Sequence, residues 1–93
     1  MFDWDEANAG HIWDRHRIST EEAEEVLLAD DRVSYSSRVE RSERRFMVVG
    51  STGTGRVLTV VYAWRASRIR VVSAREPSSR ELRNYRASKR GKR

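Results

Sequence analysis

Two short apolar runs in the last third of the chain, residues 57–64 and 69–74, form its clearest hydrophobic pattern. Both are dense in Val, Ile, Thr, Tyr and Trp, residue types that fit the half-buried surface of a β-sheet. The connection from Arg65 to Arg68 is short enough to join antiparallel neighbours, although it lacks the Asn-Gly or Asp-Gly pair that favours the tightest turns. This pattern predicts a β-hairpin.

An earlier segment alternates apolar and polar positions and predicts two more strands. Val33 and Tyr35 begin the alternation, which extends to Ser37; residues 38–44 are strongly charged and predict a polar connection, and residues 45–50 predict the next strand. The Ser-Thr-Gly-Thr-Gly stretch at 51–55 predicts a hairpin tip, because it lacks the lysine and the glycine spacing of phosphate-binding loops. Four strands in succession predict an antiparallel meander with helices packed on one face.

The N-terminal third carries helix signals. Phe2 and Trp4 flank an acidic residue in a short segment that is either an edge strand or an anchored arm. Asp5 is a candidate N-cap for the helix that follows. The face that this helix would bury is predicted from residues that recur at helical spacing: Ala9, Ile12, Trp13 and His16.

Two further helices begin with a capping box, in which a serine and a glutamate three residues later bond to each other's backbone. Ser19 and Glu22 form the first box, and this helix is predicted to end near residues 30–31. Ser78 and Glu81 form the second, after which Leu82 and Tyr85 give a narrow apolar stripe. Residues 87–93 are basic and predict a flexible tail.

The length of 93 residues predicts one domain with a single modest core, which we place at residues 1–86. The elements together predict an α+β fold with two N-terminal helices, a four-stranded, mainly antiparallel sheet and a C-terminal helix. No apolar run reaches the roughly 18 residues of a membrane span. The acidic start of the chain is unlike a signal peptide, and the absence of cysteine suits a reducing cytoplasm.

Charge is distributed unevenly along the chain. Residues 1–31 carry 10 acidic and 2 basic side chains, whereas residues 32–93 carry 4 acidic and 17 basic ones. Nearly all of the positive charge is arginine, whose planar fork suits bidentate contacts to phosphate. We therefore expect a nucleic-acid backbone or an acidic protein as the ligand. A generic arginine-rich, solvated surface is the alternative.

Metal chemistry is not indicated by the sequence. Without cysteine there is no thiolate ligand. His11 and His16 are five positions apart, which separates them by more than about 100° around a helix. A two-histidine metal site is therefore not expected, and we predict no cofactor.

An ordered set of short motifs from Phe2 to Tyr85 resembles the BrnT family, the ribonuclease toxins of BrnT/BrnA type II toxin-antitoxin systems, which have a RelE-like fold. The motifs that carry the resemblance are Trp4-Asp5-Glu6 with Asn8, His16 with Ile18-Ser19, Glu21-Glu22-Ala23, Glu43-Arg44-Arg45-Phe46, Gly50, Gly55-Arg56 with the strand after it, the segment from Arg68 to Arg75, Arg80-Glu81, and Tyr85.

The resemblance implies a cytoplasmic, metal-independent endoribonuclease that cleaves RNA, inhibits translation and growth, and is neutralised by a BrnA-like antitoxin. The implied complex is a dimer of heterodimers that binds operator DNA through the antitoxin.

Cleavage by attack of the RNA's own 2′-hydroxyl needs a base, positive donors for the phosphorane and an acid for the leaving oxygen. The resemblance and the residue chemistry assign Arg75 to the transition-state charge. The other candidate catalytic residues are Arg45, which would hold a phosphate, and the proton-transfer candidates Glu43, Glu81 and His16. The candidate RNA-binding residues are Arg56, Arg70, Arg80, Arg83 and Tyr85.

Structural alternatives remain for these residues, namely an ion pair for Arg75, a helix-terminal contact for His16 and core packing for Tyr85. At the level of the whole protein, the alternatives are a non-catalytic, arginine-rich module that binds nucleic acid or protein, and an adaptor whose acidic and basic parts join two proteins.

Overall fold

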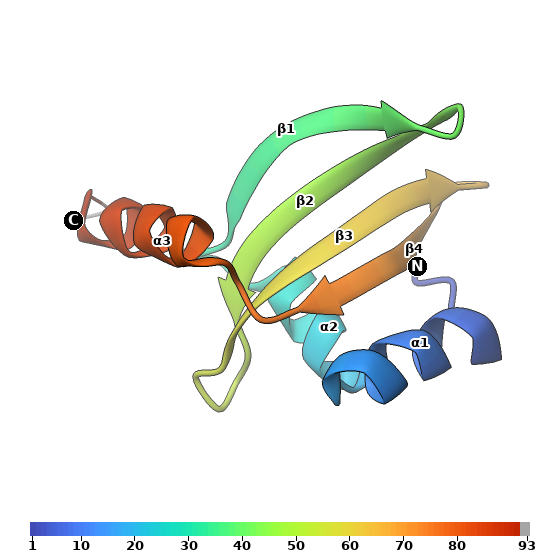
Figure 1. Cartoon of the computed structure of the whole chain (residues 1–93), viewed down its shortest axis with the longest axis horizontal. Coiled ribbons are helices and arrows are strands. Elements are labelled where there is room, and N and C mark those ends of the chain that lie inside the picture. Colours follow the sequence, from blue (N-terminus) through green and yellow to red (C-terminus); the bar gives the residue numbers. More distant parts are fainter. Residues whose placement is uncertain (92–93) are drawn as a thin grey trace.

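Four antiparallel strands, paired in sequence order, form the sheet at the centre of the molecule (Figure 1). The computed structural model describes residues 1–91. The strands are β1 (Val33–Glu40), β2 (Glu43–Ser51), β3 (Val57–Arg65) and β4 (Arg68–Arg75). At the free edge of β4, Phe2 forms a parallel bridge with Ile69, so the N-terminal arm extends the sheet. The predicted architecture is confirmed.

The predicted connection over residues 38–44 is wrong. β1 continues to Glu40 and β2 begins at Glu43, so the turn consists of Arg41 and Ser42. Charged side chains fill these strand ends because they lie on a solvated part of the sheet, where Arg45 and Glu40 form an ion pair at 3.2 Å. The charged segment at residues 38–44 therefore forms the end of a hairpin, stabilised by ion pairs, rather than a loop.

The β1–β2 and β3–β4 turns adopt a backbone that their residues disfavour. Arg41 and Ser42 have φ values of 52° and 62°, and Ala66 and Ser67 have φ values of 51° and 67°. Left-handed conformations at both central residues give the two-residue turn that matches the twist of a hairpin. Without glycine or asparagine, each residue carries a steric cost of roughly 1–2 kcal/mol.

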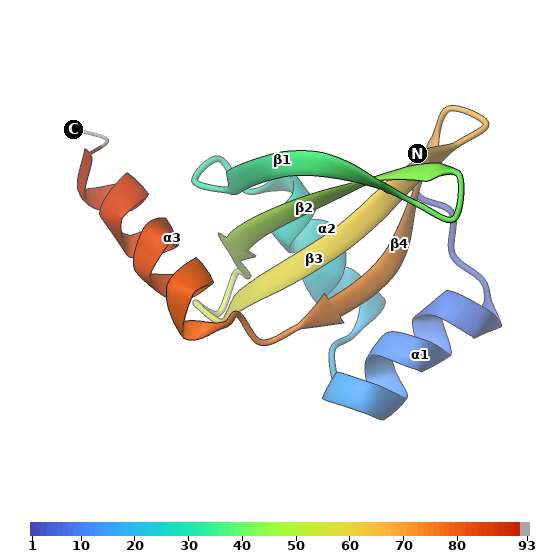
Figure 2. The same cartoon turned by 45° about the horizontal axis from the view of Figure 1, so that its top comes forward.

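Two helices, α1 (Glu6–His16) and α2 (Thr20–Leu28), cover one face of the sheet, and Figure 2 shows α2 passing behind the strands. α1 packs against β4, and α2 packs against β2 and β3. Both predicted N-caps are present, Asp5 for α1 and Ser19 for α2, each in a capping box. The core between helices and sheet is fully apolar at its centre and includes Ile12, Ile18, Val26, Leu58 and Val60.

The predicted buried face of α1 is partly wrong. Trp13 is 49% exposed and lies under the guanidinium of Arg17, 5.5 Å from the ring centre. Asn8 is buried instead, and its amide donates to the carbonyls of Asp3 and Val71 at 3.0 and 3.1 Å. A polar residue takes the core position because it satisfies backbone acceptors that no apolar side chain could bond.

The last helix, α3 (Ser79–Gly91), projects from one end of the sheet (Figure 1). The predicted capping box is present, since the Ser78 backbone N–H donates to Glu81 and the Glu81 N–H donates to the Ser78 hydroxyl. Tyr85 is buried and donates its hydroxyl to Asp31 at 2.6 Å, which anchors the helix. Residues 87–91 are helical where a tail was predicted, and residues 92–93 of that tail lie outside the described residues.

The face of the sheet opposite α1 and α2 is not covered by these helices. The strand register places Met47 opposite Val61 and Thr59 opposite Arg75, two residues apart along β3 and therefore on this face. No helix within residues 1–91 has the length and apolar character needed to cross a membrane.

Candidate active site

A cleft of about 340 Å³ lies on the open face of the sheet. All four strands and the first turn of α3 contribute to its walls. Three arginines and two glutamates supply its charge, and its lining residues are Ser36, Arg38, Glu40, Arg45, Phe46, Met47, Val61, Arg75 and Glu81. Arg75, Arg45 and Glu81, three of the five predicted catalytic residues, are therefore brought together.

Arg75 ends β4 and turns its guanidinium toward α3. Its Nη1 donates to Glu81 Oε1 at 2.8 Å and its Nη2 to Glu81 Oε2 at 3.0 Å, a bidentate pair. The side chain remains 35% exposed, and this part faces the cleft that it lines. Bidentate bonding fixes the plane of a guanidinium, so Arg75 is oriented before any ligand arrives.

Other groups besides Arg75 bind the carboxylate of Glu81. Its Oε1 also accepts bonds from the Thr59 hydroxyl at 2.9 Å and the Ser78 backbone N–H at 2.8 Å. The Arg75 guanidinium, followed by the Ser78 and Thr59 bonds, lowers the pKa of Glu81 from 4.5 to about 2, against the opposing effect of burial. The carboxylate is therefore ionised at neutral pH and is a weak base.

Arg45 is the second arginine of the cleft and is 20% exposed. Its Nη1 donates to Glu40 Oε1 at 3.2 Å. Its Nε lies 3.8 Å from Glu43 Oε1, too far for a hydrogen bond, and has no hydrogen-bond partner among the described residues. Arg38 is more exposed and lies 3.9 Å from Glu40, so part of the donor capacity of both arginines is unused.

Glu43 lies beside the cleft and does not line it. It accepts two bonds from Arg65, at 2.8 and 3.2 Å, and the Arg65 guanidinium lowers the pKa of this carboxyl. Arg70 pairs with Asp3 and Asp5 at 3.6 and 3.1 Å. Arg45, Arg65 and Arg70 together with His11 border a second hollow of about 310 Å³ against α1.

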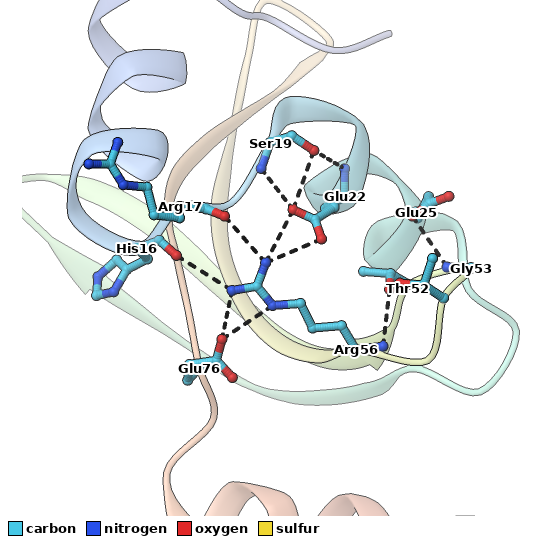
Figure 3. A network of polar contacts seen from close by, with 10 residues as sticks. His16, Arg17, Ser19, Glu22, Glu25, Thr52, Gly53, Arg56 and Glu76 are labelled. Atoms are coloured by element: carbon cyan, nitrogen blue, oxygen red, sulfur yellow. Dashed lines mark hydrogen bonds and ion pairs between the residues drawn. The ribbon is translucent and has the colours of Figure 1, made fainter.

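Arg56 lies outside the cleft, in the polar network of Figure 3. It pairs with Glu76 at 2.8 Å and Glu22 at 3.2 Å, and it donates to the backbone carbonyls of Arg17 and His16 at 3.3 and 3.5 Å. The Glu76 and Glu22 carboxylates raise its pKa. These contacts join the end of α1, the capping box of α2 and the connection between β4 and α3, which is a structural role.

The remaining predicted residues also lie outside the cleft lining. His16 contributes its carbonyl to the Arg56 network, and its ring points away from the bonds drawn in Figure 3. Tyr85 has its ring buried and its hydroxyl bound to Asp31, so no base can stack on it in this conformation. Arg80 and Arg83 are exposed on α3, and Arg83 borders a separate hollow.

Sequence reasoning missed Arg38 and Glu40 as cleft residues because both fell in the predicted connection. A detectable signal was present, since arginine and glutamate alternate on both strands, Arg38 with Glu40 on β1 and Glu43 with Arg45 on β2. The register sets like charges directly opposite each other, so the opposite charges meet diagonally, as in the pair between Arg45 and Glu40. Among residues 1–91, no three side chains of His, Asp or Glu come close enough together to hold a metal ion.

The fold and the arginine-rich cleft define a small α+β protein suited to binding a polyanion. A comparison with family profiles matches residues 4–81, most of the chain, to the profile described as "Ribonuclease toxin, BrnT, of type II toxin-antitoxin system". The chain therefore belongs to the BrnT family of ribonuclease toxins, and the resemblance inferred from the sequence is confirmed.

The solved structures agree with this assignment at the level of the fold. The structure is similar to the crystal structure of the Brucella abortus ribonuclease toxin BrnT, with a TM-score of 0.62 over 84% of this chain and 96% of that chain. The two sequences are 18% identical over the match. A comparison with curated proteins finds no match.

Proposed function

We propose that this BrnT-family toxin cleaves RNA in the cleft by attack of the RNA's own 2′-hydroxyl, without a metal ion, and that Arg75 stabilises the charge of the phosphorane. The observation that carries this proposal is the position of Arg75, which is oriented by two bonds to Glu81 and is still exposed to the cleft. A preorganised donor placed where charge develops is the largest single contribution in many enzymes.

Arg45 and Arg38 hold the phosphate groups of the RNA on either side of the reacting one. Two features support this assignment: both side chains line the cleft, and the Arg38 guanidinium is 77% exposed with only a 3.9 Å contact to Glu40. Phosphate oxygens are strong acceptors for the planar guanidinium group.

The proton-transfer roles divide between the carboxylates. With a pKa of about 2, Glu81 fits the positioning of Arg75 better than the removal of a proton from a hydroxyl. Glu40 lines the cleft with about half of its side chain exposed, so it is the carboxylate that an incoming ribose can reach. Glu43 and His16 keep the candidate roles given to them by the sequence, although they lie outside the cleft lining.

A type II toxin has a cognate antitoxin, and we propose that it is a BrnA-like protein that covers the basic cleft in the cytoplasm. The proposed complex is a dimer of heterodimers that binds operator DNA through the antitoxin. The excess of arginine over carboxylate in the cleft supports an acidic segment as the part of the antitoxin that enters it.

A cleavage assay with matched RNAs tests the mechanism. The purified protein is incubated in EDTA with an RNA oligonucleotide and with the same oligonucleotide carrying a single 2′-deoxy substitution at the cleaved nucleotide. We expect cleavage of the first only, with a 2′,3′-cyclic phosphate end. Cleavage of both RNAs, or a requirement for added metal, would contradict the mechanism.

Two variants test the site. Arg75→Ala is expected to lower kcat by about 100-fold or more, the usual cost of removing one oxyanion donor. Arg86→Ala removes an exposed arginine from α3 as the matched control and is expected to leave kcat unchanged. RNA binding without cleavage by the wild type would instead favour the non-catalytic module.

A further inference from the structure

The β1–β2 and β3–β4 turns lie at the same end of the sheet (Figure 1). Two exposed apolar side chains belong to the strand ends beside these turns. Trp64 is 53% exposed and Val39 is 58% exposed. Three exposed arginines belong to the same strand ends and turns, namely Arg41, Arg44 and Arg68. These five residues are called the tip patch below.

The strand register places the centre of the tip patch on one face of the sheet. Val39 pairs with Arg44 across β1 and β2. Phe46 pairs with Tyr62 across β2 and β3, so Arg44 and Trp64, each two residues further toward its turn, point to the same side of the sheet as Phe46 and Tyr62. The row Val39, Arg44 and Trp64 therefore points to the same side, the side that α1 and α2 cover nearer the core.

Toward the core, apolar side chains follow Trp64 on the same face of the sheet. Trp64 pairs with Ile69, which in turn bridges to Phe2, and both of these inner residues are packed against the core. Trp64 is thus the point where the apolar surface of the sheet emerges from under the helices. An indole exposed at the end of a rigid sheet is available for contact at little conformational cost.

The charge around this indole is not neutralised by the protein. Within the described part of the chain, Arg41, Arg44 and Arg68 have no carboxylate within 4.0 Å; Arg44 donates only to the Ser37 hydroxyl, at 2.8 Å. The nearby Glu40 and Glu43 are already paired with other arginines. A partner of negative charge is therefore favoured.

Single-stranded RNA fits this combination better than a protein surface does. A base can stack on the indole, while phosphates on either side meet the three unpaired guanidinium groups. A protein partner would have to bury several of these charges around one aromatic group, which costs desolvation energy.

The tip patch and the cleft lie on opposite faces of the same hairpin. Arg38 and Arg45 line the cleft, and their immediate neighbours in sequence, Val39 and Arg44, point to the opposite face within the tip patch. An RNA strand leaving the cleft past Arg38 and Arg45 therefore reaches Trp64 by passing around the end of the hairpins.

We propose that the tip patch is a second RNA-binding site, in which an unpaired base of the substrate, outside the cleaved step, stacks on Trp64. The proposal rests on the proposed function for the identity of its ligand. It makes the affinity for RNA depend on length, because an oligonucleotide confined to the cleft cannot reach the indole.

Binding of non-cleavable, fully 2′-O-methylated RNA tests this by fluorescence anisotropy. The probes are a single strand of about 12 nucleotides, within the size range of single-strand sites, and a trinucleotide of the same composition. Trp64→Ala is expected to weaken binding of the longer strand by about tenfold and to leave trinucleotide binding unchanged. Trp64→Phe is expected to retain most of the affinity.

Trp13→Ala is the matched control, because Trp13 is a similarly exposed tryptophan that lies on α1, outside the tip patch. Equal affinity of the Trp64→Ala and Trp13→Ala variants for the longer strand would overturn the proposal. So would loss of antitoxin binding by Trp64→Ala with unchanged RNA binding, which would make the patch a protein-docking surface. Since the probes cannot be cleaved, failure of the cleavage assay and failure of this assay are distinguishable.

Discussion

Replacing Glu81 with glutamine tests the claim that this carboxylate holds Arg75 in place. The pKa of Glu81 falls from its ordinary 4.5 to about 2 in the folded protein. A difference of about 2.5 pKa units at about 1.4 kcal/mol per unit corresponds to roughly 3 kcal/mol, which is an upper bound because Arg75, the main cause of the shift, is 35% exposed and solvent screens the pair. Because the folded-state pKa is the lower one, this stabilisation is complete above about pH 4.5 and is lost as the pH falls toward 2.

Urea unfolding of the wild type and of Glu81→Gln between pH 2 and 7 measures this contribution. We expect the variant to be less stable by about 2–3 kcal/mol at pH 7, because the amide accepts from Thr59 and Ser78 but no longer neutralises Arg75. The difference between the two proteins is expected to shrink steadily below about pH 4.5, even though other carboxylates titrate in both.

A matched control is Glu21→Gln on α2, an exposed glutamate bonded only to the neighbouring Thr20 hydroxyl at 3.2 Å. This variant is expected to change the free energy of unfolding by less than about 0.5 kcal/mol throughout the range from pH 2 to 7. If Glu81→Gln lost no more stability than Glu21→Gln, or if its deficit persisted undiminished at pH 2, the assignment of Glu81 as an ionised anchor would be refuted.

Three further changes follow from other contacts. Arg56→Ala leaves two carboxylates unpaired and is expected to cost about 1–3 kcal/mol in urea unfolding; an unchanged midpoint would contradict its structural role. The double change Ala66→Asn and Ser67→Gly matches the left-handed turn and is expected to add about 1–2 kcal/mol in thermal unfolding, whereas no gain would show that the turn carries no strain. Tyr85→Phe removes the 2.6 Å bond to Asp31 and is expected to cost about 1 kcal/mol, measured by urea unfolding; a neutral result would mean that apolar packing alone anchors α3.

Local signals predicted most of the helices and strands. The capping boxes at Ser19 and Ser78 depend on residues three positions apart, so they can be read directly from the sequence, and both are present. The dense β-branched runs of β3 and β4 are equally local. The end of β1 was missed because its charged residues are satisfied by partners on β2, and that compensation depends on the register of the hairpin.

The division of roles among the arginines is not local. Sequence reasoning placed both Arg75 and Arg56 at the RNA site, one as a catalytic and the other as an RNA-binding residue. Arg56 instead meets Glu22 and Glu76, which lie 34 and 20 positions away. Only the folded structure shows that Arg56 joins three parts of the chain, whereas Arg75 is exposed to the cleft. Tyr85 was misjudged in the same way, because its partner Asp31 is 54 residues earlier.

The uneven distribution of charge also has an explanation within the fold. Acidic residues of the first third pair with basic residues of the last half: Glu22 with Arg56, Asp5 with Arg70, and Asp31 with Lys89. Part of the negative charge of the N-terminal segment is thus neutralised by ion pairs within the molecule. The arginines of the cleft and of the tip patch are among the basic side chains that remain available for a ligand.

The most direct test of the proposed active site is a crystal structure of the protein with a non-cleavable, 2′-O-methylated RNA. We predict that the phosphate of the blocked step lies within hydrogen-bonding distance of Arg75, with Glu81 still bound to the far side of the guanidinium. An RNA whose blocked phosphate lay elsewhere, for example in the hollow beside Arg83 on α3, would contradict the assignment of the cleft as the site of cleavage.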